Sequence, residues 1–208
     1  MVAQEQDKRA LLIAGPTASG KSGVALQLAR QFNGTVINAD AMQVYAELRV
    51  LSARPSLEDE RSVPHRLYGQ IGAAERFSSG KWLDAASRAL GEVWEAGRLP
   101  IVVGGTGLYF KMLESGVARV PDIPPEVRSG VEALYRSEGL DGLKARLPEG
   151  YEPFGDPQRL MREVEVFEAT GRRLRDLQSQ NSPSLLAGAT VVRACLTLDR
   201  VELYPVKR

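Results

Sequence analysis

Eight residues close to the start of the chain have the types and the order that bind phosphate. Residues 15–22 fit G-x-x-x-x-G-K-[ST], the pattern of the phosphate-binding P-loop. Gly15 and Gly20 let the backbone turn its N–H groups towards one anion. Lys21 adds a full positive charge, and the Ser22 hydroxyl is a ligand for Mg²⁺. The whole run is predicted to bind a diphosphate or a nucleotide: Gly15, Pro16, Thr17, Ala18, Ser19, Gly20, Lys21 and Ser22.

The flanking sequence predicts the elements that must position this loop. An apolar run predicts a strand over 9–14 before it. A helix is predicted over 21–32 after it, with Val24, Leu28 and Phe32 at fourfold spacing on one apolar face. A strand, a loop and a helix in this order are the context in which such a motif binds phosphate.

Two further polar segments also follow predicted strands. Residues 38–43 come after a strand at 35–37, and residues 104–107 come after a strand at 99–103. A helix from Ser78 or Ser79 to about residue 96 lies between them, with Trp82, Ala86, Leu90, Val93 and Trp94 towards the core. This alternation predicts an α/β fold, a P-loop NTPase-like parallel sheet flanked by helices. Because ligands bind at the carboxyl ends of parallel strands, all three segments are expected to share one rim.

The second half of the chain has a different character. Prolines at 121, 124 and 125 indicate an exit from the sheet, and helices are predicted over 125–137, 140–147 and 157–170. A strand over 190–198 is predicted to return to the sheet. The chain therefore divides into a P-loop core at 1–116, a helical insertion at 117–180, and a return strand with the chain end at 181–208.

Composition narrows the classes of protein. The chain has 208 residues, 43% of them hydrophobic, and a formal charge of +1, which gives no bulk attraction to nucleic acid. No stretch approaches the ~20 apolar residues of a membrane span, and the polar start is unlike a signal peptide. We expect a cytoplasmic enzyme that acts as a monomer and contacts no membrane. The single cysteine, Cys195, excludes an internal disulfide and lies in an apolar run typical of a buried core residue.

Three other stretches, taken with the P-loop, closely resemble the tRNA dimethylallyltransferase family. They are Asn38–Tyr45 (NADAMQVY), Gly104–Tyr109 (GGTGLY) and Asp156–Arg162 (DPQRLMR), the last followed by Glu165-Val166 and Thr170-Gly171. The resemblance runs from about Arg9 to Tyr204, and four motifs in one order are far more specific than any one of them. Members of this family usually continue for roughly another hundred residues, a domain-sized increment.

The resemblance implies a reaction. The family transfers a dimethylallyl (isopentenyl) group from dimethylallyl diphosphate to N6 of adenine 37 in the anticodon loop of tRNA, with Mg²⁺ as the cofactor. It implies that Lys21 and the P-loop stabilise the leaving diphosphate. It implies that Asp40 is the general base at N6, although an Asp at this place can also cap a turn or hold Mg²⁺ through water. By resemblance Thr106 contacts the reacting region, and it also suits the N-cap of the next helix.

The remaining roles that the resemblance implies concern RNA. The residues matching family contacts with tRNA are Asp40, Ala41, Met42, Gln43, Thr106, Arg128, Gln158, Arg159, Leu160, Met161 and Arg162. Arginines at 172, 173 and 175 could hold the RNA backbone together with those at 159 and 162. The same charges are also compatible with the solvated face of an ordinary helix.

Other functions remain open on the sequence alone. The same chemistry could act on AMP, although the Q-R-x-x-R stretch at 158–162 favours tRNA. A small-molecule kinase would use the same P-loop. A remnant that binds without turnover is the third alternative, and it rests on how early the chain stops compared with the family.

Overall fold

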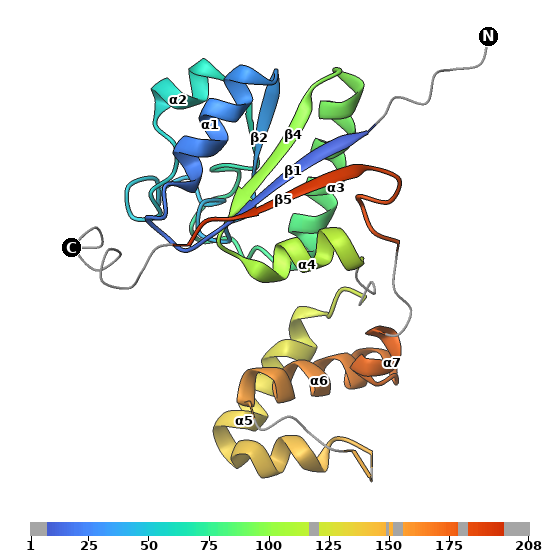
Figure 1. Cartoon of the computed structure of the whole chain (residues 1–208). Coiled ribbons are helices and arrows are strands. Elements are labelled where there is room, and N and C mark those ends of the chain that lie inside the picture. The colour runs from blue at the N-terminus through green and yellow to red at the C-terminus, as the bar shows by residue number, and fades with distance from the viewer. Residues whose placement is uncertain (1–7, 117–120, 149, 152–155, 179–182, 198–208) are drawn as a thin grey trace. The chain divides into compact units, whose positions relative to one another are not determined.

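The computed structural model of the chain describes residues 8–116, 121–148, 150–151, 156–178 and 183–197 (Figure 1). The chain forms two compact units. The first comprises 1–116 with 183–208, and we call it the P-loop unit. The second comprises 117–182, and we call it the helical unit. No helix in the described part of the chain is long and apolar enough to cross a bilayer.

Five parallel strands form the centre of the P-loop unit, in the order β3-β2-β4-β1-β5. Their bounds are β1 Arg9–Ala14, β2 Gly34–Asn38, β3 His65–Arg66, β4 Leu99–Gly104 and β5 Thr190–Cys195. The register pairs Ala14 with Gly104, and Asn38 with Val103. The carboxyl ends of β1, β2 and β4 are therefore level, which confirms the predicted parallel sheet and its shared rim.

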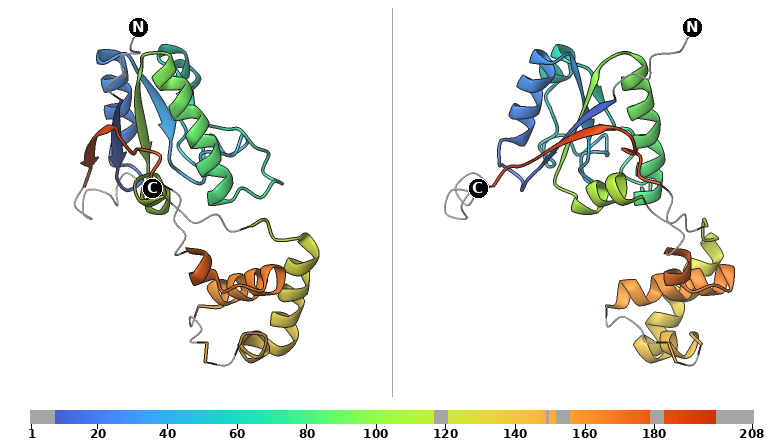
Figure 2. Two further views of the ribbon diagram at one scale, coloured as in Figure 1. Left: turned by 90° about the vertical axis from the view of Figure 1, so that its right-hand side faces the viewer. Right: turned by 45° about the vertical axis from the view of Figure 1, so that its right-hand side comes forward.

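Helices cover both faces of the sheet (Figures 1 and 2). α1, Lys21–Gln31, packs with the side chains of Ile13, Val36 and Ile101 on one face. α3, Ser79–Glu95, and α4, Gly107–Ser115, pack on the other face. The short helix α2, Leu57–Ser62, begins at a capping box in which Ser56 and Asp59 exchange hydrogen bonds. Alternate residues of each strand thus serve two separate cores.

The fourfold repeat in α1 marks the face that meets the sheet only at Leu28, which packs partly buried against the core on that side. Val24 is 37% exposed and Phe32 is 53% exposed, whereas Ala25 and Ala29 are buried. Small residues are needed because the helix lies close to the strands: a Cβ on Gly34 would lie 3.0 Å from the Ala29 Cα. Close approach, rather than side-chain size, therefore selects the buried face.

Helix α3 follows the sequence expectation. Ser78 caps it by accepting a hydrogen bond from the Lys81 N–H at 3.2 Å. Trp82, Ala86, Leu90 and Val93 are buried as predicted, and Trp94 packs partly buried against the same core.

Cys195 corrects an expectation, since it is exposed and not buried. It lies at the end of β5, the edge strand of the sheet, whose side chains are partly or fully exposed along its length. The apolar run was correctly interpreted as a strand, but an edge strand has only one neighbour to bury it. The strand predicted over 190–198 ends at Cys195, since residues 196 and 197 are not part of it, and residue 198 lies outside the described residues.

The helical unit is built from α5, Pro125–Ala145, α6, Pro157–Thr170, and α7, Leu174–Gln178. α5 kinks at Gly139, where φ is 66° and ψ is −149°, which accounts for the two helices expected there. The bounds of α6 agree with the prediction, because Asp156 caps its start and Gly171 ends it in the left-handed conformation. Val131, Leu143, Leu160 and Val164 form the core between α5 and α6.

Candidate active site

The P-loop forms a cradle between β1 and α1. Gly20 precedes the helix with φ of 80°, and Ala18 also has positive φ, 70°. A Cβ on Gly15 would lie 2.8 Å from the Ser19 Oγ and 2.7 Å from the Leu196 carbonyl oxygen. Ser19 is 8% exposed, and within the described structure its hydroxyl has no hydrogen-bond partner. A buried hydroxyl without a partner, in a turn that only glycine fits, suits an anion that would complete its bonding.

Lys21 lies at the first position of α1 with only 7% of its surface exposed. Its ammonium donates to the Pro16 carbonyl at 3.0 Å, so the side chain folds back over the loop. Burial lowers the pKa of this amine, and the charge of Asp40 offsets part of that effect. The interaction places a carboxylate within electrostatic reach of the phosphate cradle.

Asp40 is held in one orientation by a buried asparagine. Asn38 has no exposed surface, and its side-chain amide donates to the Asp40 carbonyl at 2.9 Å and to the Leu67 carbonyl at 3.1 Å. The Asn38 Oδ1 accepts from the Asp40 N–H at 2.9 Å. The Asp40 Oδ1 accepts from the Met42 N–H at 2.9 Å, which is the turn-capping role that the sequence left open.

The second carboxylate oxygen of Asp40 faces the loop after β4. A Cβ on Gly105 would lie 3.5 Å from the Asp40 Oδ2 and 3.5 Å from the Gly15 carbonyl oxygen. The absent side chain of Gly105 therefore leaves a space bounded by the carboxylate and by the start of the P-loop. At this rim the Asp40 Oδ2 and the Gly15 carbonyl of the P-loop therefore both lie next to Gly105.

Thr106 ties the loop after β4 to the loop after β2. Its Oγ1 accepts from the Ala41 N–H at 3.0 Å, and its N–H donates to the Ala39 carbonyl at 3.2 Å. Thr106 occupies the N-cap position of α4, but its hydroxyl makes no cap hydrogen bond there. All three segments that follow strands thus meet at one rim, as the sequence predicted.

Residues 41–43 differ in what their side chains are free to do. Met42 is 53% exposed and Ala41 is half-buried. Gln43 is buried, and its amide donates to the carbonyls of Ser52 at 2.8 Å and Ala53 at 3.3 Å. Gln43 therefore holds the loop that follows, and its expected contact with RNA stays a prediction.

Two aromatic residues, Trp82 and Tyr109, pack beneath the end of β2, and the sequence predicted no role for them at the site. The Trp82 indole donates to the Asn38 carbonyl at 2.9 Å, and its ring stacks on Tyr109 with centroids 4.0 Å apart. Burial, with smaller effects from Tyr45 and Asp40, raises the pKa of Tyr109 to about 12. The role of Asn38 in holding the Asp40 backbone has a signal in the sequence. An Asn two residues before an Asp at the end of a strand is a turn-forming pair.

The other predicted RNA contacts lie in the helical unit. Gln158 and Arg159 are exposed on the first turn of α6, and Arg162 pairs with Glu165 at 3.0 Å. Leu160 is fully buried in the core, so its side chain is unavailable to a partner in this packing, and Met161 is half-buried. Arg128 is half-buried, and its Nε has no hydrogen-bond partner within the described structure.

The donor set at this rim suits Mg²⁺ rather than a metal held by protein alone. The described residues contain no group of three or more His, Cys, Asp or Glu that could hold a metal ion. Ser22 is exposed on the first turn of α1, beside Lys21, and Asp40 is the carboxylate of this rim. Mg²⁺ keeps several waters and is commonly bound by one or two protein oxygens together with substrate phosphates.

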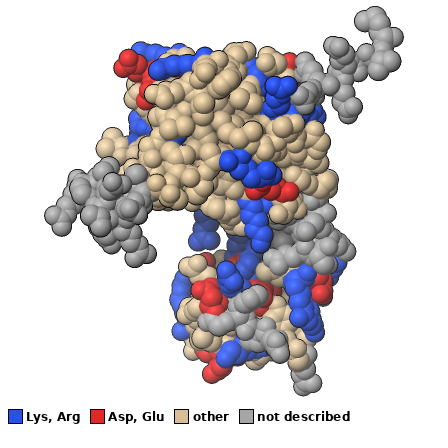
Figure 3. Space-filling view, viewed as in Figure 1, with Lys and Arg blue, Asp and Glu red and all other residues tan. Residues whose placement is uncertain are grey.

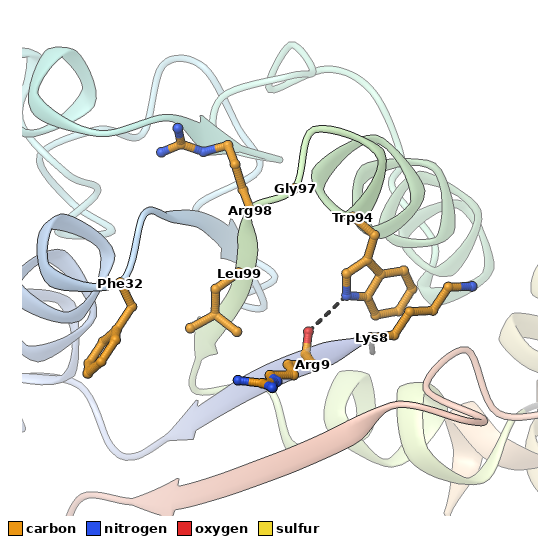
Figure 4. Close-up of a pocket in the computed structure, with 7 residues that line it drawn as sticks. All are labelled: Lys8, Arg9, Phe32, Trp94, Gly97, Arg98 and Leu99. Atoms are coloured by element: carbon orange, nitrogen blue, oxygen red, sulfur yellow. Dashed lines mark hydrogen bonds between the residues drawn. The ribbon is translucent and has the colours of Figure 1, made fainter. Parts of the chain in front are cut away.

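Two of the cavities adjoin the central strands and their loops. One of about 110 Å³ adjoins the phosphate loop and is lined by Ser22, Gly23, Leu26, Val36, Pro55, Asp59, His65 and Tyr68. Another of about 430 Å³ lies at the amino ends of β1 and β4, away from the rim (Figure 4). There the Trp94 indole donates to the Arg9 carbonyl at 2.8 Å, and the Lys8 ammonium lies 5.3 Å from the Trp94 ring centroid.

Comparison with known proteins gives consistent results. Residues 43–206 match the family model described as IPP transferase, and residues 8–74 match the model described as isopentenyl transferase. A tRNA dimethylallyltransferase of Rhodopseudomonas palustris (strain TIE-1) is 50% identical over 201 residues, which cover 93% of this chain and 66% of that protein. The chain thus spans about two thirds of the length of the curated relatives it matches.

Solved structures agree in fold. A eukaryotic dimethylallyltransferase acting on tRNA is similar with a TM-score of 0.72 at 24% identity, over 96% of this chain and 50% of that one. A tRNA isopentenylpyrophosphate transferase from Staphylococcus epidermidis has a TM-score of 0.58 at 25% identity, over 96% of this chain and 67% of that one.

Proposed function

Because the chain belongs to the IPP transferase family, we propose that it transfers a dimethylallyl group from dimethylallyl diphosphate to N6 of adenine 37 in the tRNA anticodon loop, releasing diphosphate. One observation carries this proposal: the Asp40 carboxylate faces the phosphate loop across the space beside Gly105. Alkylation of a weakly nucleophilic amine needs a base beside the phosphate loop. A kinase can use the same two groups, and the family match is what favours the transferase. The curated relatives named as tRNA dimethylallyltransferases support the same choice.

The proposed reaction is a substitution at the allylic carbon of the diphosphate donor. The bond between the allylic carbon and the diphosphate oxygen breaks, and its electron pair leaves with the diphosphate. The N6 lone pair forms the new C–N bond, and the amine loses a proton to Asp40. Backbone N–H groups of the P-loop, the Lys21 ammonium and the Ser19 hydroxyl face the leaving charge. Ser22 and the substrate phosphates would hold Mg²⁺, which would neutralise more of that charge.

Asp40 is suited to the role of base by its rigidity. Its Oδ1 accepts from the Met42 N–H, so the carboxylate cannot rotate freely, and its Oδ2 lies beside Gly105, close to the start of the P-loop. Thr106 fixes the neighbouring loop through the Ala41 N–H. Holding the acceptor atom in one place avoids an entropic cost during the reaction.

The acceptor would be a base taken out of its stack. Single-stranded RNA loops are recognised by splaying bases into pockets while basic side chains hold the backbone. The exposed Gln158 and Arg159 on α6, and the exposed Met42 beside Asp40, are the side chains we propose for those contacts. We also propose that the chain acts in the cytoplasm as a monomer, where tRNA is available.

The proposal is tested by one reaction. The protein is incubated with Mg²⁺, dimethylallyl diphosphate and unmodified tRNA that carries adenine at positions 36 and 37. The RNA is then digested and searched by mass spectrometry for isopentenyladenosine. Parallel reactions replace tRNA with AMP, or dimethylallyl diphosphate with ATP, and a further control uses Asp40→Asn.

Isopentenyladenosine from the parent chain and a large loss in Asp40→Asn is the expected result. A folded protein that binds diphosphate but modifies only AMP, hydrolyses only ATP, or forms no product would overturn the proposal. Turnover by Asp40→Asn near the parental rate would remove Asp40 from the role of base while leaving the reaction in place.

A further inference from the structure

The two tryptophans of the chain, both on α3, hold opposite ends of the sheet by the same kind of bond. The Trp82 indole N–H donates to the carbonyl of Asn38, the last residue of β2, at 2.9 Å. The Trp94 indole N–H donates to the carbonyl of Arg9, the first residue of β1, at 2.8 Å. At a rise of about 1.5 Å per residue, the two positions lie about 18 Å apart along the helix. Of these two bonds, only that of Trp82 lies at the rim where the proposed reaction takes place.

Asn38 joins the Trp82 bond to the Asp40 turn. Its backbone carbonyl accepts from Trp82, while its side-chain amide donates to the Asp40 carbonyl at 2.9 Å and its Oδ1 accepts from the Asp40 N–H at 2.9 Å. Asn38 has no exposed surface. A buried carbonyl that loses a donor is costly, so the chain would move to recover a partner. Any such movement of Asn38 carries the Asp40 turn with it.

The ring of Trp82 also supports the second loop of the rim. It stacks on Tyr109 with ring centroids 4.0 Å apart and an angle of 8° between the planes. Tyr109 lies on the first turn of α4, and its N–H donates to the Thr106 carbonyl at 2.9 Å. The Thr106 hydroxyl in turn accepts from the Ala41 N–H at 3.0 Å. Trp82 is therefore linked to both loops that meet beside Gly105.

Trp82 acts on the site without touching a substrate. It has no exposed surface, and Tyr109 is only 4% exposed. Figure 3 shows the Lys, Arg, Asp and Glu side chains of the P-loop unit mostly towards the margins of the face in view. Trp82, Tyr109 and Asn38 are uncharged, so this support of the Asp40 turn depends on neutral hydrogen bonds and on stacking. Packing alone would accept a phenylalanine at position 82, and the indole N–H is the part that packing does not require.

We propose that Trp82 is a positioning residue for Asp40, which it holds at the rim through the Asn38 carbonyl and the Tyr109 ring. This inference rests on the proposed function, in which Asp40 is the base. Proton transfer needs the acceptor within hydrogen-bond reach of the amine, and a displacement of about 1 Å can cost about a hundredfold in rate. Trp94 makes the equivalent bond at the far end of the sheet, where it contributes to stability alone.

Transfer kinetics compare the two tryptophans directly. Trp82→Phe keeps an aromatic ring against Tyr109 and removes the indole N–H, and Trp94→Phe makes the same change at the other end of α3. At saturating tRNA, kcat is expected to fall about tenfold in Trp82→Phe, with an unchanged KM for dimethylallyl diphosphate, because the P-loop lies between β1 and α1. Trp94→Phe is expected to keep the parental kcat, although it loses an equivalent hydrogen bond. Equal kcat values in the two variants, or a change in KM alone, overturn the proposal.

A double variant tests the route through Asn38. If Trp82 acts by holding Asn38, removing the Asn38 side chain should already release Asp40. The combination of Trp82→Phe with Asn38→Ala is therefore expected to turn over no more slowly than Asn38→Ala alone. Losses of kcat that multiply in the double variant would show that the two residues act independently, and would overturn positioning through Asn38.

Amide hydrogen exchange, followed by NMR, reports on the Asp40 turn without any turnover. The Met42 N–H donates to the Asp40 Oδ1, and the Ala41 N–H donates to the Thr106 hydroxyl. Relative to the amides of β1, both are expected to exchange faster in Trp82→Phe than in the parent, and at the parental rate in the control variant with the other tryptophan replaced. Parental exchange at both amides in Trp82→Phe overturns the proposal.

Tyr109→Leu covers the case in which Trp82→Phe does not fold. It removes the stack and keeps the indole N–H, and it is expected to speed exchange at Ala41 and to lower kcat. Parental exchange and parental kcat in this variant would overturn the proposal.

Exchange and transfer are measured separately so that the two proposals can be told apart. A parent chain that makes no isopentenyladenosine overturns the transferase function, and faster exchange at Ala41 and Met42 in Trp82→Phe then still supports the link from Trp82 to the Asp40 turn. A parent chain that makes the product, with parental kcat in Trp82→Phe, overturns the positioning role alone.

Discussion

The close packing of β2 and β4 at the rim is tested most directly by Gly104→Ala, which adds one methyl group at the last residue of β4. A Cβ there would overlap the carbonyl carbon and oxygen of Ala39 and lie 2.8 Å from its Cα. The obstacle is backbone at the end of β2, so no side chain can rotate out of the way. Gly104→Ala is therefore expected to separate β2 from β4 where Asp40 and Thr106 are positioned.

The magnitude follows from what must move. Overpacking in a close-packed region costs about 1–3 kcal/mol. Separation also weakens two backbone hydrogen bonds, from the Ala39 N–H to the Val103 carbonyl at 2.8 Å and from the Thr106 N–H to the Ala39 carbonyl at 3.2 Å. Each is worth about 1 kcal/mol. The free energy of unfolding is expected to fall by about 3–5 kcal/mol, which in a chain of this size lowers Tm by about 10 °C.

Tryptophan fluorescence during urea unfolding is the assay, because both tryptophans of the chain, Trp82 and Trp94, lie on α3 of the P-loop unit. The signal therefore follows this unit and not the helical one. Gly107→Ala is the matched control: its Cβ meets nothing within 4 Å, and alanine at the start of α4 favours the helix by about 0.5–1 kcal/mol. A Gly104→Ala protein within about 0.5 kcal/mol of the parent would refute the close packing of β2 and β4.

Three further outcomes are expected. Diphosphate affinity, measured by calorimetry from neutral pH upwards, should fall as pH rises through the pKa of Lys21, which burial lowers from its ordinary 10.5. Asp40→Asn should move this fall to lower pH, because it removes the negative charge that raises the pKa of Lys21. A pH profile that does not move in Asp40→Asn contradicts the Lys21–Asp40 interaction. Asn38→Ala loses three side-chain hydrogen bonds and should lower the free energy of urea unfolding by about 2–4 kcal/mol, whereas a loss under about 1 kcal/mol would rule out its bracing role. Gly139→Ala should lower the free energy of unfolding, measured by circular dichroism melts, by about 1–3 kcal/mol, because its φ of 66° suits only glycine. Gly130→Ala in the same helix has open space around its Cβ and should not lower that free energy.

The sequence alone was sufficient for the features that depend on neighbours along the chain. The bounds of β1 and α6 agree with the prediction, because an apolar run and a capping Asp156 are local signals. The phosphate loop is equally local, since glycines and a lysine at fixed spacing carry its chemistry. The shared rim also followed, because consecutive parallel strands in an α/β sheet end at the same edge.

Only the tertiary structure decided which atoms face one another. Whether Val24 or Ala25 faces the sheet depends on how closely α1 approaches Gly34, which periodicity does not encode. Whether Cys195 is buried depends on the position of β5 at the sheet edge, which the order of strands in the sheet determines.

The division of Asp40 between turn and reaction is the clearest case. One oxygen is taken by the Met42 N–H, and the other faces the space at Gly105, which lies on a different strand connection. The backbone of Asp40 is held by Asn38, which also donates to the Leu67 carbonyl just after the neighbouring strand β3. The types of these residues are local facts, but their mutual orientation results from contacts between segments far apart in the chain, and such contacts exist only once the sheet has formed.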